Sequence, residues 1–287
     1  MIRILVDSAA DLPMEELVAK NITLTPLTVT VGEESFKDEV ELKREKLYEY
    51  LLDGSCTVKT SQPSPQDFLD AFESAKEAGD ELICILLSSA LSGTYQSACL
   101  AKNMADYDKI YLIDSLSATV GIKILADKAL AMIAEGQTSE TIVETLEELK
   151  GRIRIKAAID TLKYLYLGGR VSKTTALVAD TVNIKPSITL NPEGEVAVVG
   201  KYLGVGRAVK DLVKQMKAAN VDENYKIYGI YSHDKTNADK LIKALNAAGI
   251  EVEDVYHLGA TLGVHVGPGA FGIIYIEKNY SNLFKRS

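Results

Sequence analysis

The chain has 287 residues, a length that suggests two domains or one large one. Its 40 acidic and 32 basic side chains give a formal net charge of −8, which argues against nucleic acid as a partner. Hydrophobic residues make up 47% of the chain and charged residues 25%, the proportions of a folded globular protein and not of a disordered one.

Two apolar segments bear on the location of the protein. Residues 2–6 are too few for a signal peptide and are followed by a charge, so we expect a cytoplasmic protein. The longest uncharged stretch, residues 259–276, contains His265 and the breaker Gly267-Pro268-Gly269, which a membrane-spanning helix would not carry. We expect a buried loop followed by a strand there, and not an integral membrane protein.

The first half of the chain repeats one local pattern, a buried apolar run followed by a polar loop and helix signals. We expect strands over 2–6, 82–87 and 110–113, each followed by a helix, near residues 14, 95 and 122 respectively. Parallel neighbours need crossover connections, so the pattern predicts a parallel sheet with helices on both faces, a three-layer α/β/α domain.

Further signals complete this half. Residues 22–31 alternate as a half-buried strand, which Pro26 restricts to an edge or a bulge. Residues 42–52 are amphipathic, and Ser64 to Asp67 form a capping box before a helix that ends at residue 78. A helix over 140–149 stops at a glycine, and we place a domain boundary after it, between residues 152 and 153.

The second half of the chain lacks the regular strand and helix alternation and predicts an α+β domain with a mixed sheet. A turn at Asn191 to Gly194 predicts a hairpin. The expected strands cover 154–159, 188–190, 196–199, 227–231, 252–256 and 271–276, and the expected helices cover 161–170, 207–219 and 237–248. We therefore expect an α/β protein of two domains, 1–152 and 153–287.

Common signatures of nucleotide, hydrolase and zinc sites are missing from the sequence. Gly204 to Val209 imitates a dinucleotide fingerprint, but its last position is valine and it does not follow the first strand of an alternating unit. The three cysteines have no Cys-x-x-Cys spacing, and the three histidines are dispersed. We expect no metal and no cofactor, and keep nucleotide binding at Gly204 to Arg207 as a hypothesis to test.

Acidic side chains follow several expected strands. Asp7 and Asp114 come directly after strands of the parallel sheet, and Asp234 follows a strand of the second half. Ligands of open α/β sheets bind at the carboxyl ends of the strands, although aspartate there also caps helices. One hypothesis is therefore a metal-dependent hydrolase or phosphotransferase that uses Asp7, Asp114 and Asp234.

Hydroxyl groups and glycines gather in other loops. Residues 88–94 read Ser-Ser-Ala-Leu-Ser-Gly-Thr at an expected helix N-terminus, where donors and a positive dipole end suit an anion. Thr60-Ser61 lies in a loop of similar chemistry, and His265 is flanked by glycines that let backbone approach a ligand. Neutral donors favour a single monoanion, such as a carboxylate, over a polyphosphate.

Several motifs follow one another along nearly the whole chain. They are Asp7-Ser8 with Asp11-Leu12-Pro13, Thr60-Ser61-Gln62-Pro63, Leu91-Ser92-Gly93-Thr94-Tyr95-Gln96-Ser97-Ala98, Asp114-Ser115, Leu165-Tyr166-Leu167-Gly168-Gly169-Arg170-Val171-Ser172, and His265-Val266-Gly267-Pro268-Gly269-Ala270. Together they resemble the DegV family, bacterial fatty-acid-binding proteins that include the acyl-carrying subunit of fatty acid kinase.

This resemblance implies a long-chain fatty acid, such as palmitate, buried between the two domains. The carboxylate would lie at Thr60 and Ser92. Ser61, the Gly93 amide and His265 would complete its hydrogen-bond shell, and Arg170 would be a neighbour.

The resemblance also implies a lipid-binding carrier with no chemistry of its own. Such a protein shields the acyl chain, presents the carboxyl group to a fatty acid kinase and serves lipid transport or fatty acid metabolism. Family members often carry several basic residues where this chain reads Lys201 to Arg207, a comparatively apolar stretch. The resemblance therefore speaks more directly for lipid binding than for kinase docking.

Overall fold

A four-stranded parallel sheet forms the first layer of the structure, a computed structural model that describes residues 1–173 and 183–278. Its strand order is β2-β1-β6-β7, and all neighbouring pairs are parallel. The strands are β1 (Ile2–Asp7), β2 (Ile22–Thr25), β6 (Glu81–Leu86) and β7 (Ile110–Asp114). The short helices η1 (Ser8–Ala10) and α1 (Met14–Ala19) connect β1 to β2.

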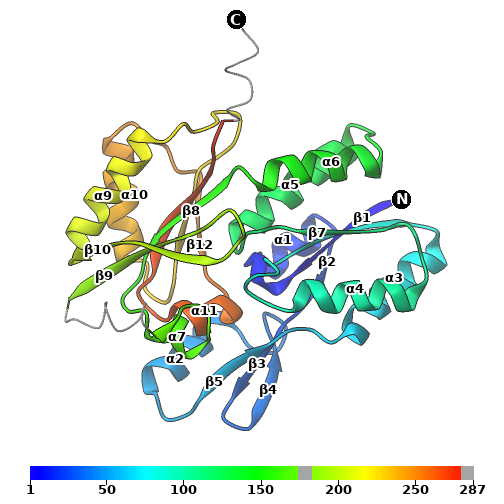
Figure 1. Cartoon of the computed structure of the whole chain (residues 1–287), viewed down its shortest axis with the longest axis horizontal. Helices are drawn as coiled ribbons and strands as arrows, with labels where there is room; N and C mark the ends of the chain where they lie inside the picture. Colours follow the sequence, from blue (N-terminus) through cyan, green and yellow to red (C-terminus); the bar gives the residue numbers. More distant parts are fainter. Residues whose placement is uncertain (174–182, 279–287) are drawn as a thin grey trace, which may run out of the picture.

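Helices cover both faces of this sheet, as the strand and helix alternation predicts (Figure 1). α3 (Pro65–Ala78) and α4 (Thr94–Ala105) pack on one face, and α5 (Val120–Ala134) and α6 (Ser139–Lys150) on the other. Successive side chains of β1 confirm the layering, because Leu5 belongs to the core under α3 and α4 whereas Ile4 and Val6 belong to the core under α5. The three-layer α/β/α architecture is therefore present.

A six-stranded mixed sheet follows in the chain, with the order β10-β9-β8-β13-β11-β12. Only β11 and β12 pair in parallel among its neighbours. The strands are β8 (Ile153–Ala158), β9 (Ile184–Leu190), β10 (Val196–Leu203), β11 (Tyr228–Tyr231), β12 (Asp254–His257) and β13 (Phe271–Ile276). The β9–β10 hairpin is longer than the sequence pattern predicts, because paired backbone extends beyond the apolar runs.

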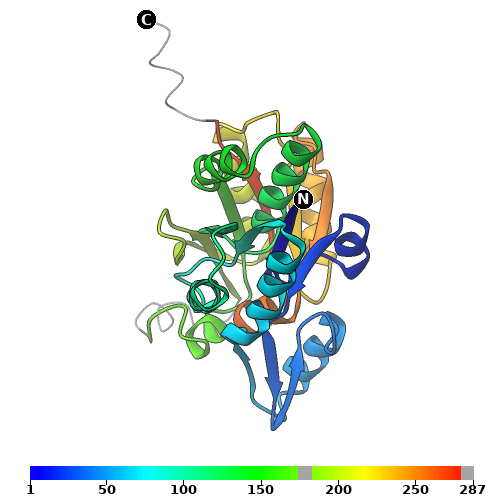
Figure 2. The same ribbon diagram turned by 90° about the vertical axis from the view of Figure 1, so that its right-hand side faces the viewer.

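One face of the mixed sheet is covered by α9 (Val205–Ala218) and α10 (Thr236–Ala247), which pack on Phe271, Ile273 and Tyr275. The opposite face carries alternate side chains such as Ile274 and belongs to the core cluster that also contains Ile4 and Val6 of the parallel sheet. Figure 2 shows the second view of this arrangement. The two sheets therefore share one apolar core, with the functional site between them.

The prediction of a single strand over 22–31 is wrong. Pro26 separates β2 from β3 (Thr28–Val31), and β3 pairs with β4 (Glu34–Lys37) and β5 (Val58–Ser61) in a separate antiparallel sheet. Proline lacks the amide that would continue the ladder, so the chain leaves the parallel sheet there. α2 (Arg44–Asp53) connects β4 and β5 and packs beside this small sheet (Figure 1).

The expected loop after residue 259 is also wrong, because residues 260–266 form the helix α11 (Ala260–Val266). Its glycine, Gly263, allows α2 to approach, since an added Cβ would lie 2.6 Å from Cδ2 of Leu47 and 2.9 Å from Oη of Tyr48. α7 (Lys163–Leu167) lies against α11. Within residues 1–173 and 183–278, no helix is both long and apolar enough to cross a membrane.

Candidate functional site

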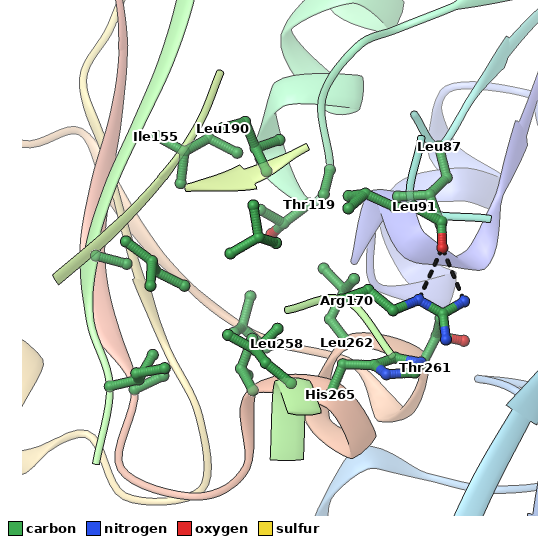
Figure 3. Close-up of a pocket in the computed structure, with 18 of the residues that line it drawn as sticks. Leu87, Leu91, Thr119, Ile155, Arg170, Leu190, Leu258, Thr261, Leu262 and His265 are labelled. Carbon is green, nitrogen blue, oxygen red and sulfur yellow. Dashed lines mark hydrogen bonds between the residues drawn. The ribbon is translucent and has the colours of Figure 1, made fainter. Parts of the chain in front are cut away.

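An elongated apolar pocket lies between the two larger sheets (Figure 3). Its empty space, including the open mouth, is about 850 Å³. Aliphatic side chains of both sheets and of α11 form most of its wall. They are Leu27, Leu87, Leu91, Ala118, Ile155, Ala157, Ile159, Leu165, Ile188, Leu190, Val196, Ile230, Leu258, Leu262, Val266 and Ala270.

Four polar lining residues, Thr60, Ser92, Arg170 and His265, form what we call the polar cluster. Thr60 Oγ1 and His265 Nε2 share a hydrogen bond of 2.7 Å, which joins β5 to the last turn of α11. In Figure 3, His265 and Arg170 lie at one end of the pocket, across from Ile155 and Leu190. The pocket is therefore mostly apolar, with Arg170 and His265 at one end, and Thr119, Thr189 and Thr261 also line it.

Hydrogen bonds of Arg170 connect the segment after α7 with the loop before α4. Its Nε and Nη2 donate to the Leu91 carbonyl at 2.9 and 2.8 Å, and Nη1 donates to the Gly168 carbonyl (Figure 3). Burial lowers the pKa of this guanidinium, which nevertheless stays charged at neutral pH. Arg170 is the one Lys or Arg side chain among the described residues that line the pocket.

His265 is held neutral by its surroundings. Burial, followed by the positive charge of Arg170, lowers the pKa of its imidazole to about 4. Its Nδ1 has no hydrogen-bond partner within residues 1–173 and 183–278 and lies against Gly168, where an added Cβ would be 2.2 Å away. A neutral imidazole can donate one hydrogen bond to an anion without adding a buried charge.

Ser92 precedes the N-terminus of α4, whose N-cap is Gly93. The Ser92 hydroxyl shares a 2.8 Å hydrogen bond with Thr94 Oγ1 and accepts one from the Thr94 amide at 3.3 Å. Two other predicted site residues, Ser61 and Gly93, are not among the lining residues: Ser61 is exposed at the end of β5, and the Gln62 side chain packs against Gly93. The structure thus gathers Thr60, Ser92, Arg170 and His265 and leaves Ser61 and Gly93 just outside.

A second cavity, with about 1280 Å³ of empty space including open solvent, adjoins the polar cluster, and we call it the outer cavity. Thr60, Arg170 and His265 line both cavities, and Lys59 and Lys163 line only the outer one. The described residues around it include no aspartate or glutamate, in a chain with a net charge of −8. A ligand head group at the polar cluster would therefore face a cationic opening.

The three aspartates of the enzyme hypothesis accept hydrogen bonds from backbone amides of their own and neighbouring loops. Asp7 accepts hydrogen bonds from the amides of Ala9 and Leu87 at 2.9 and 2.6 Å. Asp114 accepts from the Ser89 and Leu116 amides, and Asp234 from the Thr236 amide. No group of three or more His, Cys, Asp or Glu side chains in the described ranges is arranged to hold a metal ion.

The fingerprint-like segment at Gly204 has a different setting from a dinucleotide site. Gly204 is the N-cap of α9, and the strand before it, β10, is antiparallel to its single neighbour β9 at the edge of the sheet. A dinucleotide fingerprint instead follows a parallel strand inside a βαβ unit.

Sequence reasoning did not identify Thr119, which lines the pocket at the N-cap of α5. Its φ of 50° is unusual for a β-branched residue, and its Oγ1 has no hydrogen-bond partner in the described part of the chain. It also missed the pocket wall supplied by α11. No sequence signal indicates a role for Thr119. Leu262 and Val266 have helical spacing, but the segment is too short for this spacing to predict the helix α11.

Comparison with known proteins places this geometry in a family. The model of an uncharacterised protein family, DegV, matches residues 1–278. A DegV domain-containing protein of Caldanaerobacter subterraneus is 36% identical over 279 residues, covering 96% of this chain and 99% of that protein. One of Clostridium perfringens is 32% identical over 277 residues, covering 96% and 99%.

Solved structures of similar proteins carry ligand descriptions. A DegV family protein from Thermus thermophilus, described by its fatty acid binding, superposes with a TM-score of 0.87 at 29% identity, covering 96% of this chain and 99% of that one. A stearic acid-binding protein from Eubacterium ventriosum has a TM-score of 0.87 at 28% identity, covering 97% and 99%. The family match, the relatives and the shared fold establish that this chain belongs to the DegV family.

Proposed function

We propose that the protein binds one long-chain fatty acid, such as palmitate, between a domain of residues 1–152 and a domain of residues 153–287. The observation that carries the proposal is the apolar pocket between the two large sheets with its polar cluster at one end. The descriptions of the Thermus thermophilus and Eubacterium ventriosum proteins support it, because both name fatty acid binding.

The acyl tail supplies most of the affinity. Burying about 14 methylenes of palmitate, at about 0.8 kcal/mol each, gives about 11 kcal/mol of gross driving force before ordering costs. Most side chains of the pocket wall are aliphatic and cannot form hydrogen bonds with water. An acyl chain is therefore the ligand class that best matches the wall.

The carboxylate would lie at the polar cluster, where a buried charge needs hydrogen bonds. Thr60, Ser92 and His265 offer neutral donors, and Arg170 offers a nearby positive charge. We also assign Ser61 and the Gly93 amide to the outer part of this shell, since each directly follows a lining residue in the chain. The head group therefore fixes the orientation of the ligand.

We assign the protein the role of a cytoplasmic carrier without catalysis of its own, acting in lipid transport or fatty acid metabolism with no cofactor. The cationic outer cavity would leave the carboxyl group open to a fatty acid kinase. A kinase test uses the loaded protein with a bacterial fatty acid kinase and ATP. Formation of acyl phosphate supports the assignment, and none in the presence of an active kinase control contradicts it.

Mass spectrometry of the purified protein, native and then after lipid extraction, tests the binding proposal directly. We expect a stoichiometric fatty acid, because a buried acyl chain should survive purification. An empty protein that also fails to bind added palmitate would refute the proposal.

Variants test the assignment of the head group. Changing Thr60→Val and Ser92→Ala together removes two donors and should weaken palmitate binding by about 3 kcal/mol, or about a hundredfold in Kd. Binding of hexadecanol, which has the tail without the charge, should change far less. Thr30→Val, on β3 and outside the pocket lining, is a matched control. Unchanged palmitate affinity in the folded double variant would contradict the assignment.

The enzyme hypothesis predicts magnesium-dependent turnover that Asp7→Asn abolishes. The local hydrogen bonds of Asp7 instead favour a structural role, because both of its oxygens accept backbone amides. Full turnover by Asp7→Asn would dismiss the hypothesis. A thermal shift with NAD or ATP tests nucleotide binding at Gly204 in the same way.

A further inference from the structure

Beside the pocket lies a group of buried ionisable side chains that the proposed ligand does not touch. We call it the acidic cluster: Asp11, Asp38, Glu39 and Arg44, all at most 9% exposed. Glu39 and Arg44 form an ion pair of 2.7 Å. Asp11 and Asp38 form no ion pair with any residue of 1–173 or 183–278, and burial raises the pKa of both carboxyl groups, that of Asp11 to about 8.

The hydrogen bonds of this cluster converge on one short segment, residues 257–261, just before and at the start of α11. Asp11 Oδ1 accepts from the Gly259 amide at 2.8 Å. Asp38 Oδ2 accepts from the Thr261 amide at 3.1 Å and from its hydroxyl at 2.5 Å. Arg44 Nη1 donates to the His257 carbonyl. In addition, Tyr48 of α2 donates to the Leu258 carbonyl at 3.1 Å.

α11 needs such support because it has only seven residues and could not persist as an isolated helix. Its N-cap residue is Gly259, which has no side chain that could accept a hydrogen bond from the first turn. The carboxyl oxygens of Asp11 and Asp38 accept hydrogen bonds from amides at the start of this helix, which have no partner within it. The other end of the helix carries His265, whose position against Thr60 is thereby coupled to its start.

We propose that Asp11 and Asp38 are positioning residues that set the place of His265 in the polar cluster by fixing the first turn of α11. The inference rests on the proposed function, because it gives His265 its purpose as a donor to the carboxylate. Asp11 Oδ2 and Asp38 Oδ1 accept no hydrogen bond from the described residues, so the arrangement costs stability. Apolar side chains in place of the two aspartates would cost less stability. They would, however, leave the amides at the start of α11 without acceptors and would not fix the rotation of the helix.

The test measures His265 itself, by an NMR titration of its imidazole, together with ligand affinity. Asp38→Ala removes the oxygen that accepts both hydrogen bonds of Thr261, so α11 should loosen and His265 should become more hydrated. We expect the pKa of His265 to rise toward its ordinary value by about one unit or more. Palmitate affinity should fall about tenfold while hexadecanol affinity stays within about threefold.

The charged and titratable side chains that share a cavity with His265 are Tyr50, Cys56, Lys59, Lys163, Tyr164 and Arg170, and all are unchanged in these variants. Asp38→Asn keeps one acceptor and should restore the wild-type titration and affinity. Asp80→Ala is a matched control, because Asp80 is a buried aspartate that instead binds the N-terminal amine at 2.6 Å. It should leave both readouts unchanged.

A wild-type His265 titration and wild-type palmitate affinity in folded Asp38→Ala would overturn the inference. Equal losses for palmitate and hexadecanol with an unchanged His265 would also overturn it, since they would indicate a general structural defect. If Asp38→Ala does not fold, Thr261→Val removes one of the same bonds and should shift His265 in the same direction; no shift there overturns the inference. Failure of the wild type to bind palmitate would refute the proposed function, and the His265 titration would still decide the role of Asp38.

Discussion

The buried carboxyl groups predict an unusual dependence of stability on pH. Burial raises the pKa of Asp7 from 3.8 to about 7 and that of Asp11 from 3.8 to about 8. At a pH between 3.8, the pKa in the unfolded chain, and these raised values, the folded protein holds protons that the unfolded chain has released. Stability must then fall as pH rises, by about 1.4 kcal/mol per pH unit for each proton.

Two histidines make the stability of the protein rise with pH, but over a lower pH range than the aspartates. Burial lowers the pKa of His257 and His265 from 6.5 to about 4, so the unfolded chain binds the extra protons between those values. There stability rises with pH, and the two effects oppose each other. Above about pH 7.5 the histidine contribution has ended, whereas the aspartate contribution remains. From pH 6.5 to 8 we expect Asp7 and Asp11 together to lower the free energy of unfolding by about 2 kcal/mol, and the raised pKa of Asp38 acts in the same direction.

Urea denaturation at pH 6.5, 7, 7.5 and 8 measures this loss. Asp11→Asn keeps an acceptor for the Gly259 amide but cannot titrate, so it should reduce the loss of stability between pH 6.5 and 8. Asp234→Asn is the control, because Asp234 is exposed and its lowered pKa places its titration far below this range. Stability that stays constant or increases from pH 6.5 to 8 in the wild type would refute the reasoning.

Two further substitutions probe the pocket. Gly168→Ala would place a Cβ 2.2 Å from Nδ1 of His265, displace the ring and lower palmitate affinity about tenfold by calorimetry, whereas Gly151→Ala, with its nearest neighbour at 3.9 Å, should leave binding unchanged. Equal affinities for both variants would contradict the placement of His265. Leu190→Trp fills the end of the pocket across from His265, so competition between fatty acids should shift toward shorter chains (Figure 3). An unchanged chain-length preference would place the tail elsewhere.

Local patterns in the sequence were sufficient for the parallel sheet and most helices. Apart from Arg3, residues 2–6 are apolar because helices cover both faces of β1, so burial is visible without knowledge of the fold. The capping box before α3 was predicted from residue spacing and is present, with Ser64 and Asp67 bonded to each other's backbone amides. The motifs around Thr60, Ser92 and His265 indicated a fatty acid site, although they lie far apart in the chain.

Only the tertiary structure decided how these parts meet. The split at Pro26 and the helix α11 depend on long-range partners, the small antiparallel sheet in one case and Asp11, Asp38 and α2 in the other. A seven-residue helix has too few turns to produce a readable periodicity, and its hydrogen bonds come from residues more than 200 positions away. The sequence by itself therefore determined the layers and named the polar residues, whereas tertiary contacts decided that Thr60, Ser92, Arg170 and His265 share one end of an apolar pocket.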